Sequence, residues 1–117
     1  MSKHNDALYL GHMLDYARLA HSKVAGISRE QFDADDTLQF AVTHLIQIVG
    51  EAATQISPAT RTNHPEVPWT DVAGMRHHIV HDYVNVDFDI VWETATRRLP
   101  ALIEQLEKFT PPEPPSA

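Results

Sequence analysis

The stretch DTLQFAVTHLIQIVGEAATQI, residues 36–56, decides the fold of this chain. Its apolar residues recur at intervals of three and four, and they form one wide face: Leu38, Ala41, Val42, Leu45, Ile46, Val49, Ala52, Ala53 and Ile56. Asp35 or Asp36 is the expected N-cap, and Pro58 is the expected stop. An apolar face this wide predicts a helix at the centre of the domain.

Towards the N-terminus the same period predicts another helix, from a cap at Asn5 or Asp6 to about Val24, with Gly26 ending it. Its apolar stripe comprises Leu10, Met13, Leu14, Ala17 and Ala20. Between the two helices, residues 28–31 (Ser-Arg-Glu-Gln) are typical of a short capped turn that leads to Phe32.

Towards the C-terminus, residues 61–68 are expected to form a loop, because Asn63, Pro65 and Pro68 punctuate them. A third helix is expected from about Trp69 or Thr70 to about Val80. The last helix should begin after a cap at Asp87 and kink at Pro100.

These segments predict an all-α bundle of four to five helices with short links. We expect one helical domain over residues 1–110 and a Pro-rich disordered tail over residues 111–117. A chain of 117 residues is long enough for one hydrophobic core but not for two.

The composition narrows the class of protein. No apolar run approaches the roughly 20 residues that span a bilayer, and no signal pattern opens the chain, so a cytoplasmic protein without membrane contact is expected. Cysteine is absent, which excludes disulfides and thiolate metal sites. The formal net charge of -7 is unusual for a nucleic-acid binder, so any RNA site must gather its cations locally.

The side chains suited to catalysis are concentrated in one stretch, RHHIVHDY, residues 76–83. It places Arg76, His81 and Tyr83 at offsets of zero, five and seven. Arginine stabilises phosphate oxyanions, and histidine transfers protons near neutral pH. Together these two residue types suggest work on a phosphodiester. On an ideal helix Arg76 and His81 lie about 140° apart, so either the helix ends or bulges between them, or a second subunit brings two motifs together.

Structural interpretations of the same residues stay open. On a continuous helix Arg76 would share a face with Trp69 and Val80, so it could be a buried ion-pair partner of Glu51 or Asp71. His77, His78 and His81 have a spacing that could bind a metal ion, but no carboxylate or thiolate partner stands at a recognisable spacing, so no metal site and no cofactor are predicted. His77 and His78 also fit ordinary surface positions.

The spacing Arg76-x4-His81-x-Tyr83 resembles the signature of HepT-like toxins in the HEPN superfamily. The surroundings are similar as well: Val49-Gly50-Glu51-Ala52 in the long helix, Trp69-x5-Met75-Arg76 before the motif, and Val86-Asp87 with Val91-Trp92 after it. The resemblance extends from about Ala7 to Leu106.

The resemblance implies a metal-independent endoribonuclease, the toxin of a type VII toxin–antitoxin system, acting as a homodimer or higher oligomer. It implies that Arg76 holds the scissile phosphate, that His81 is the general acid or base, and that His77 assists. The antitoxin of such systems is a MntA-like nucleotidyltransferase, and its AMPylation target would be Tyr83. The alternative is a non-catalytic dimeric adaptor for a nucleotidyltransferase, with Arg76 as a structural anchor.

Overall fold

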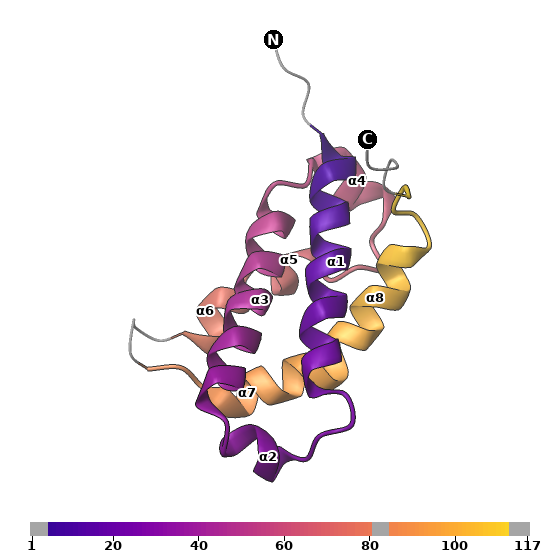
Figure 1. Cartoon of the computed structure of the whole chain (residues 1–117). Coiled ribbons are helices and arrows are strands. Elements are labelled where there is room, and N and C mark those ends of the chain that lie inside the picture. The colour runs from indigo at the N-terminus through magenta and orange to yellow at the C-terminus, as the bar shows by residue number, and fades with distance from the viewer. Residues whose placement is uncertain (1–4, 81–84, 113–117) are drawn as a thin grey trace.

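Two helices of 19 residues, α1 (Asp6–Val24) and α3 (Asp36–Thr54), run side by side at the centre of the fold (Figure 1). The computed structural model describes residues 5–80 and 85–112. Asn5 and Asp35 cap the two helices as predicted, each accepting a hydrogen bond from the backbone N–H three residues on. Their facing side chains are buried, and those from α3 include Val42, Leu45, Ile46, Val49, Ala52 and Ala53. The central helix predicted from the apolar pattern is therefore confirmed.

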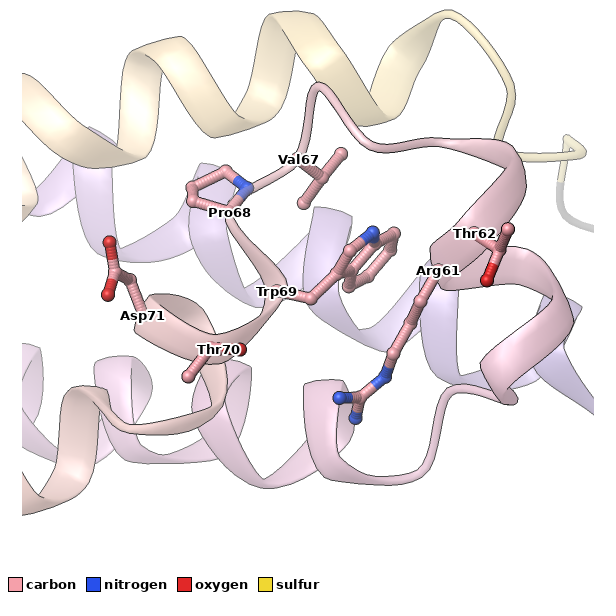
Figure 2. Close-up of a pocket in the computed structure, with 7 residues that line it drawn as sticks. All are labelled: Arg61, Thr62, Val67, Pro68, Trp69, Thr70 and Asp71. Atoms are coloured by element: carbon pink, nitrogen blue, oxygen red, sulfur yellow. The ribbon is translucent and has the colours of Figure 1, made fainter.

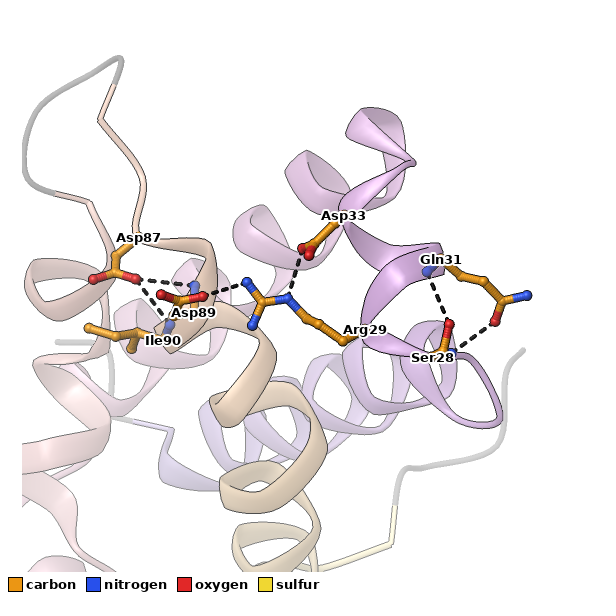
Figure 3. Close-up of polar contacts among 7 residues, drawn as sticks. All are labelled: Ser28, Arg29, Gln31, Asp33, Asp87, Asp89 and Ile90. Carbon is orange, nitrogen blue, oxygen red and sulfur yellow. Dashed lines mark hydrogen bonds and ion pairs between the residues drawn. The ribbon is translucent and has the colours of Figure 1, made fainter.

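The connection between α1 and α3 is the capped turn that the sequence predicted. Gly26 has a φ of 80°, a conformation that favours glycine, and the chain then enters α2 (Arg29–Asp33). The Ser28 hydroxyl accepts from the Gln31 N–H while the Gln31 side chain accepts from the Ser28 N–H, which is a capping box (Figure 3). This turn places Phe32 in the core with no exposed surface.

Arg29 connects α2 to the start of the last helix. Its guanidinium donates to Asp33 at 2.7 Å and to Asp89 at 2.5 Å (Figure 3). Hydrogen bonds to Asp33 and Asp89 raise the pKa of Arg29 above its ordinary value. All three groups are substantially exposed, so this link contributes little to stability but helps to orient α2.

The loop predicted for residues 61–68 is partly helical, which corrects the prediction. Helix α4 (Pro58–Asn63) begins at the proline that was expected only to stop α3. Proline suits the first turn of a helix because its φ is already helical and its missing N–H is not needed there. Ser57 caps α4, and the Asp6 carboxylate accepts from the Ser57 N–H at 2.9 Å, so the starts of α1 and α4 are tied together.

The third helix is broken, whereas the sequence predicted a continuous one. Helix α5 (Trp69–Ala73) ends at Gly74, and α6 (Met75–Ile79) begins directly after it. Gly74 has φ −88° and ψ 0°, outside the regular helical region. Glycine is a poor helix former, so breaking the helix at Gly74 costs less free energy than breaking it at a neighbouring residue.

The last helix begins at the predicted cap and is disturbed close to Pro100. Asp87 accepts from the N–H groups of Asp89 and Ile90 to start α7 (Phe88–Glu93). A π-helical turn, η1 (Thr94–Arg98), then separates α7 from α8 (Leu99–Glu107), and the chain changes direction between them (Figure 1). Pro100 lies in the first turn of α8, so the predicted kink takes the form of a π-helical turn just before the proline.

The predicted all-α class is confirmed. Within residues 5–80 and 85–112 the β-structure amounts to one isolated bridge between Val80 and Val86. One core unites α1, α3, the α5–α6 pair and the last helix. In the part of the chain that the structure describes, none of the helices combines the length and the hydropathy of a bilayer-spanning segment. The division into a domain of residues 1–110 and a tail of residues 111–117 stays a prediction, and residues 113–117 lie outside the described part.

Candidate functional site

Arg76 lies on the surface, at the second position of α6. Its side chain is 57 % exposed, and its Nη1 lies 3.4 Å from Oε1 of Glu51, which is 61 % exposed. The expectation that Arg76 occupies a core-facing position is wrong. That expectation assumed a continuous helix, whereas α5 ends at Gly74 and Arg76 stands in the first turn of a separate short helix. Of the two predicted ion-pair partners, Glu51 is the one that the structure supplies.

The positions of Glu51 and Arg76 depend on how closely α3 approaches the α5–α6 corner, the junction at Gly74 where α5 and α6 meet. A Cβ added to Gly50 would lie 3.1 Å from the carbonyl oxygen of Val72, closer than side chains normally come to a backbone oxygen. The absence of a side chain at Gly50 therefore lets the two backbones touch. Val72 and Met75 are buried at this contact, so Glu51 on α3 and Arg76 on α6 are held next to each other by the core.

Helix α6 ends between Arg76 and the expected position of His81. Ile79 is buried, and Val80 is extended, with φ −117° and ψ 105°. Val80 pairs with Val86, and the Asp87 N–H donates to the Ile79 carbonyl at 2.8 Å. The sequence offered a helix end as one way to bring Arg76 and His81 together, and α6 does end at Ile79. That the two side chains meet stays a prediction. His81 and Tyr83 themselves lie outside the described residues.

The neighbouring histidines and arginines have other surroundings. His77 and His78 are both exposed, as ordinary surface histidines would be. His78 lines a hollow of about 360 Å³ together with Asp71, Glu93 and Arg98. His78 stands about 200° round the helix from Arg76, so this hollow and the Glu51 pair occupy different sides of α6. Within residues 5–80 and 85–112 no group of three or more potential ligands is arranged to bind a metal ion.

An open hollow of about 400 Å³ at α4 and α5 contains another arginine, which the sequence analysis did not single out. Figure 2 shows Arg61 and Asp71 on opposite sides of this hollow, with Trp69 between them. The Arg61 guanidinium donates to the carbonyls of Ala53 at 2.8 Å and Ile56 at 3.2 Å. These carbonyls belong to the end of α3 and the turn after it, so Arg61 acts as a C-terminal cap and its charge has a structural use.

Comparison with known proteins agrees with the resemblance seen in the sequence. The family model described as "Ribonuclease HepT-like" matches residues 13–109. A protein of Caldanaerobacter subterraneus subsp. tengcongensis, provisionally named as an RNase, is 36 % identical over 86 % of this chain and 90 % of its own length. "Probable ribonuclease HepT" of Thermococcus cleftensis is 34 % identical over 86 % of this chain and 92 % of its own length.

A further relative, from Methanocaldococcus jannaschii and also provisionally named as an RNase, is 30 % identical over 93 % of this chain and 90 % of its own length. No solved structure gives a significant match. The family model covers most of the chain, including Arg76 and the elements on both sides of it. With this coverage and these relatives, the chain belongs to the HepT-like ribonuclease family.

Proposed function

We propose that this chain is the toxin of a toxin–antitoxin system and cleaves RNA as a metal-independent endoribonuclease. Membership of a ribonuclease family supports RNA as the substrate. The observation that carries the proposal is Arg76, an exposed cation at the start of α6, in a chain whose net charge is -7. An exposed guanidinium is able to meet a phosphate, whereas a buried one is not.

In the proposed reaction the RNA supplies its own nucleophile. The 2′-oxygen attacks the adjacent phosphorus, the bond from phosphorus to the 5′-oxygen breaks, and a 2′,3′-cyclic phosphate remains. Arg76 holds the phosphate and stabilises the negative charge that develops on its oxygens. His81 acts as general base on the 2′-hydroxyl or as general acid on the 5′-oxygen. His77, which is exposed next to Arg76, assists by orienting the phosphate.

The same exposure weighs against the adaptor alternative, in which Arg76 is a structural anchor. A surface ion pair such as Arg76–Glu51 typically contributes about 0–1 kcal/mol to stability. The fold therefore has little need of this arginine. A residue with little structural use and an accessible charge is better suited to binding.

We also propose that the active form is a homodimer or a higher oligomer. The exposed Phe40 on α3 supports this part of the proposal, because 60 % of that large aromatic residue is open to solvent. Association of two copies would bring two Arg76 side chains to one assembly and raise the local positive charge that RNA binding needs.

Regulation is proposed to act through Tyr83. A MntA-like nucleotidyltransferase would transfer AMP from ATP to this hydroxyl, forming a phosphodiester and releasing pyrophosphate. The added negative charge, close in sequence to Arg76, would compete with RNA for the cation, by the electrostatics that govern phosphorylation.

Cleavage of labelled RNA in the presence of EDTA tests the proposal. The unmodified protein should cleave, and Arg76→Ala and His81→Ala should each abolish cleavage while far-UV circular dichroism stays unchanged. His78→Ala is the matched control, because His78 lies on another side of α6, and it should retain activity. Cleavage that survives both substitutions would place the active site elsewhere, and a chain that cuts no RNA would favour the adaptor function.

Mass spectrometry tests the regulatory part separately. After incubation with a MntA-like transferase and ATP, the peptide that contains Tyr83 should gain the mass of one or more AMP groups. Tyr83→Phe should remove the added mass and leave the protein active in the presence of the transferase. AMP found on another residue would reject Tyr83 as the target without affecting the nuclease proposal.

A further inference from the structure

We propose that Glu51 is the counter-ion that RNA phosphate must displace from Arg76, so that this carboxylate limits the affinity of the site for RNA. The inference rests on the proposed function, since it takes Arg76 as the phosphate-binding cation. It assigns to Glu51 a role in substrate binding, where the sequence suggested only a structural ion pair.

The contact between Glu51 and Arg76 has the properties of an exchangeable pair. It consists of one long contact, 3.4 Å from Nη1 to Oε1, whereas the strongest arginine–carboxylate pairs are bidentate with distances of about 2.7–2.9 Å. Both side chains are more than half exposed, so water already screens their attraction. A phosphate that offers two oxygens to the guanidinium fork would form the stronger interaction.

The backbone nevertheless keeps the carboxylate at the site. Glu51 follows Gly50, where α3 touches the carbonyl of Val72, and Val49, two residues before Glu51, is fully buried. The Glu51 side chain is able to rotate away from Arg76, but its Cα is unable to withdraw. A bound phosphate would therefore remain near a negative charge even after it has replaced that charge at the guanidinium.

The other acids near the motif do not share this position. Asp71 and Glu93 line the hollow beside His78, on another side of α6. Among the described residues, Glu51 is the carboxylate paired with Arg76. A single substitution should therefore remove the opposing charge without disturbing other contacts.

Binding of an RNA that cannot be cleaved measures this effect directly. Fluorescence anisotropy with a labelled oligonucleotide that carries 2′-O-methyl groups gives the Kd, because without a free 2′-hydroxyl no strand is cut. Glu51→Gln keeps the shape of the side chain and removes its charge. We expect the variant to bind at least about fivefold more tightly at low salt, and the gain to shrink as salt screens the repulsion.

Two further variants make the result specific. Glu104→Gln removes an exposed charge from α8, a helix that packs on α1 and η1, and should leave the Kd nearly unchanged. In an Arg76→Ala background, Glu51→Gln should give a much smaller gain, because the carboxylate is proposed to act through the guanidinium. Circular dichroism confirms that each variant is folded.

The failures of the two proposals are distinguishable. If Arg76→Ala weakens binding but Glu51→Gln leaves the Kd unchanged, the counter-ion role is rejected and the phosphate-binding role of Arg76 stands. If Arg76→Ala has no effect on binding, both are rejected. A Glu51→Gln variant with an unchanged Kd whose kcat on cleavable RNA falls 100-fold or more would also overturn the inference, since Glu51 would then be a proton-transfer group.

Discussion

His21 on α1 places its Nδ1 3.0 Å from the carbonyl oxygen of Ala95, in the π-helical turn η1. In a regular α-helix the Leu99 N–H would donate to the Ala95 carbonyl oxygen, but here it donates to the carbonyl oxygen of Thr94. The next residue along, Pro100, has no N–H to offer. The backbone therefore provides no hydrogen-bond donor from residue 99 or 100 for the Ala95 carbonyl. His21, with its proton on Nδ1, donates to it instead.

We predict that His21→Leu lowers the free energy of unfolding by about 1–3 kcal/mol, because it leaves the Ala95 carbonyl partly buried without a donor. Urea denaturation followed by circular dichroism measures the loss. In a Pro100→Ala background the residue at position 100 regains an N–H, so the same substitution should cost clearly less. Equal losses in both backgrounds would show that His21 stabilises the fold through packing alone.

We predict opposite effects for alanine at two helical glycines. A Cβ at Gly11 meets nothing within 4 Å, so Gly11→Ala should stabilise the protein by about 0.5–1 kcal/mol through helix propensity. A Cβ at Gly50 would press on the Val72 carbonyl at 3.1 Å, so Gly50→Ala should lose that gain and shift α5 and α6 away from α3. Thermal unfolding compares the two variants, and a stabilised Gly50→Ala protein with full RNA cleavage would contradict the prediction.

We predict that Asp6→Ala destabilises the protein by about 2 kcal/mol, since its carboxylate accepts hydrogen bonds from the Ser57 backbone, the Ser57 hydroxyl and the Thr60 hydroxyl. The loss should appear in chemical denaturation without a change of fold. Asp15→Ala, at an exposed position of the same helix, is the control and should change stability by less than about 0.5 kcal/mol. Similar losses in the two variants would mean that a general charge effect, and not this network, is responsible.

We predict that Phe40→Asp prevents self-association while the monomer stays folded, because Phe40 is 60 % exposed and its replacement places a charge in the proposed contact. Sedimentation velocity at several concentrations gives the mass. Leu19→Asp, at a position of α1 that is 41 % exposed, is the matched control and should leave the assembly intact. An assembly that survives Phe40→Asp but is lost in Leu19→Asp would move the interface to α1.

The sequence predicted the helical elements well where local signals agree with the apolar period. Asn5, Ser28, Asp35 and Asp87 all cap helices at the positions where they were expected. Each capping side chain satisfies backbone N–H groups only a few residues away, so its effect is encoded locally. The same local reasoning missed α4, because Pro58 was taken as a stop when it also suits the first turn of a new helix.

The site was less predictable, and Arg76 shows why. Its type and its spacing from His81 and Tyr83 were visible in the sequence and resembled those of the family to which the chain belongs. Its exposure was not visible, because the helical wheel treated residues 69–80 as one helix, whereas the structure divides them at Gly74. The roles of Arg76, His77, His81 and Tyr83 stay predictions, and the last two lie outside the described residues.

The sequence alone determined the all-α class, the positions of the caps and the presence of the Arg76 motif, since each depends on residues close together in the chain. Only the tertiary structure decided that Glu51 faces Arg76 and that His21 serves the carbonyl of Ala95. These pairs are 25 and 74 residues apart, and they meet only because α3 packs on the α5–α6 corner and α1 packs on η1. A contact between distant segments depends on how whole helices pack, and no local pattern records it.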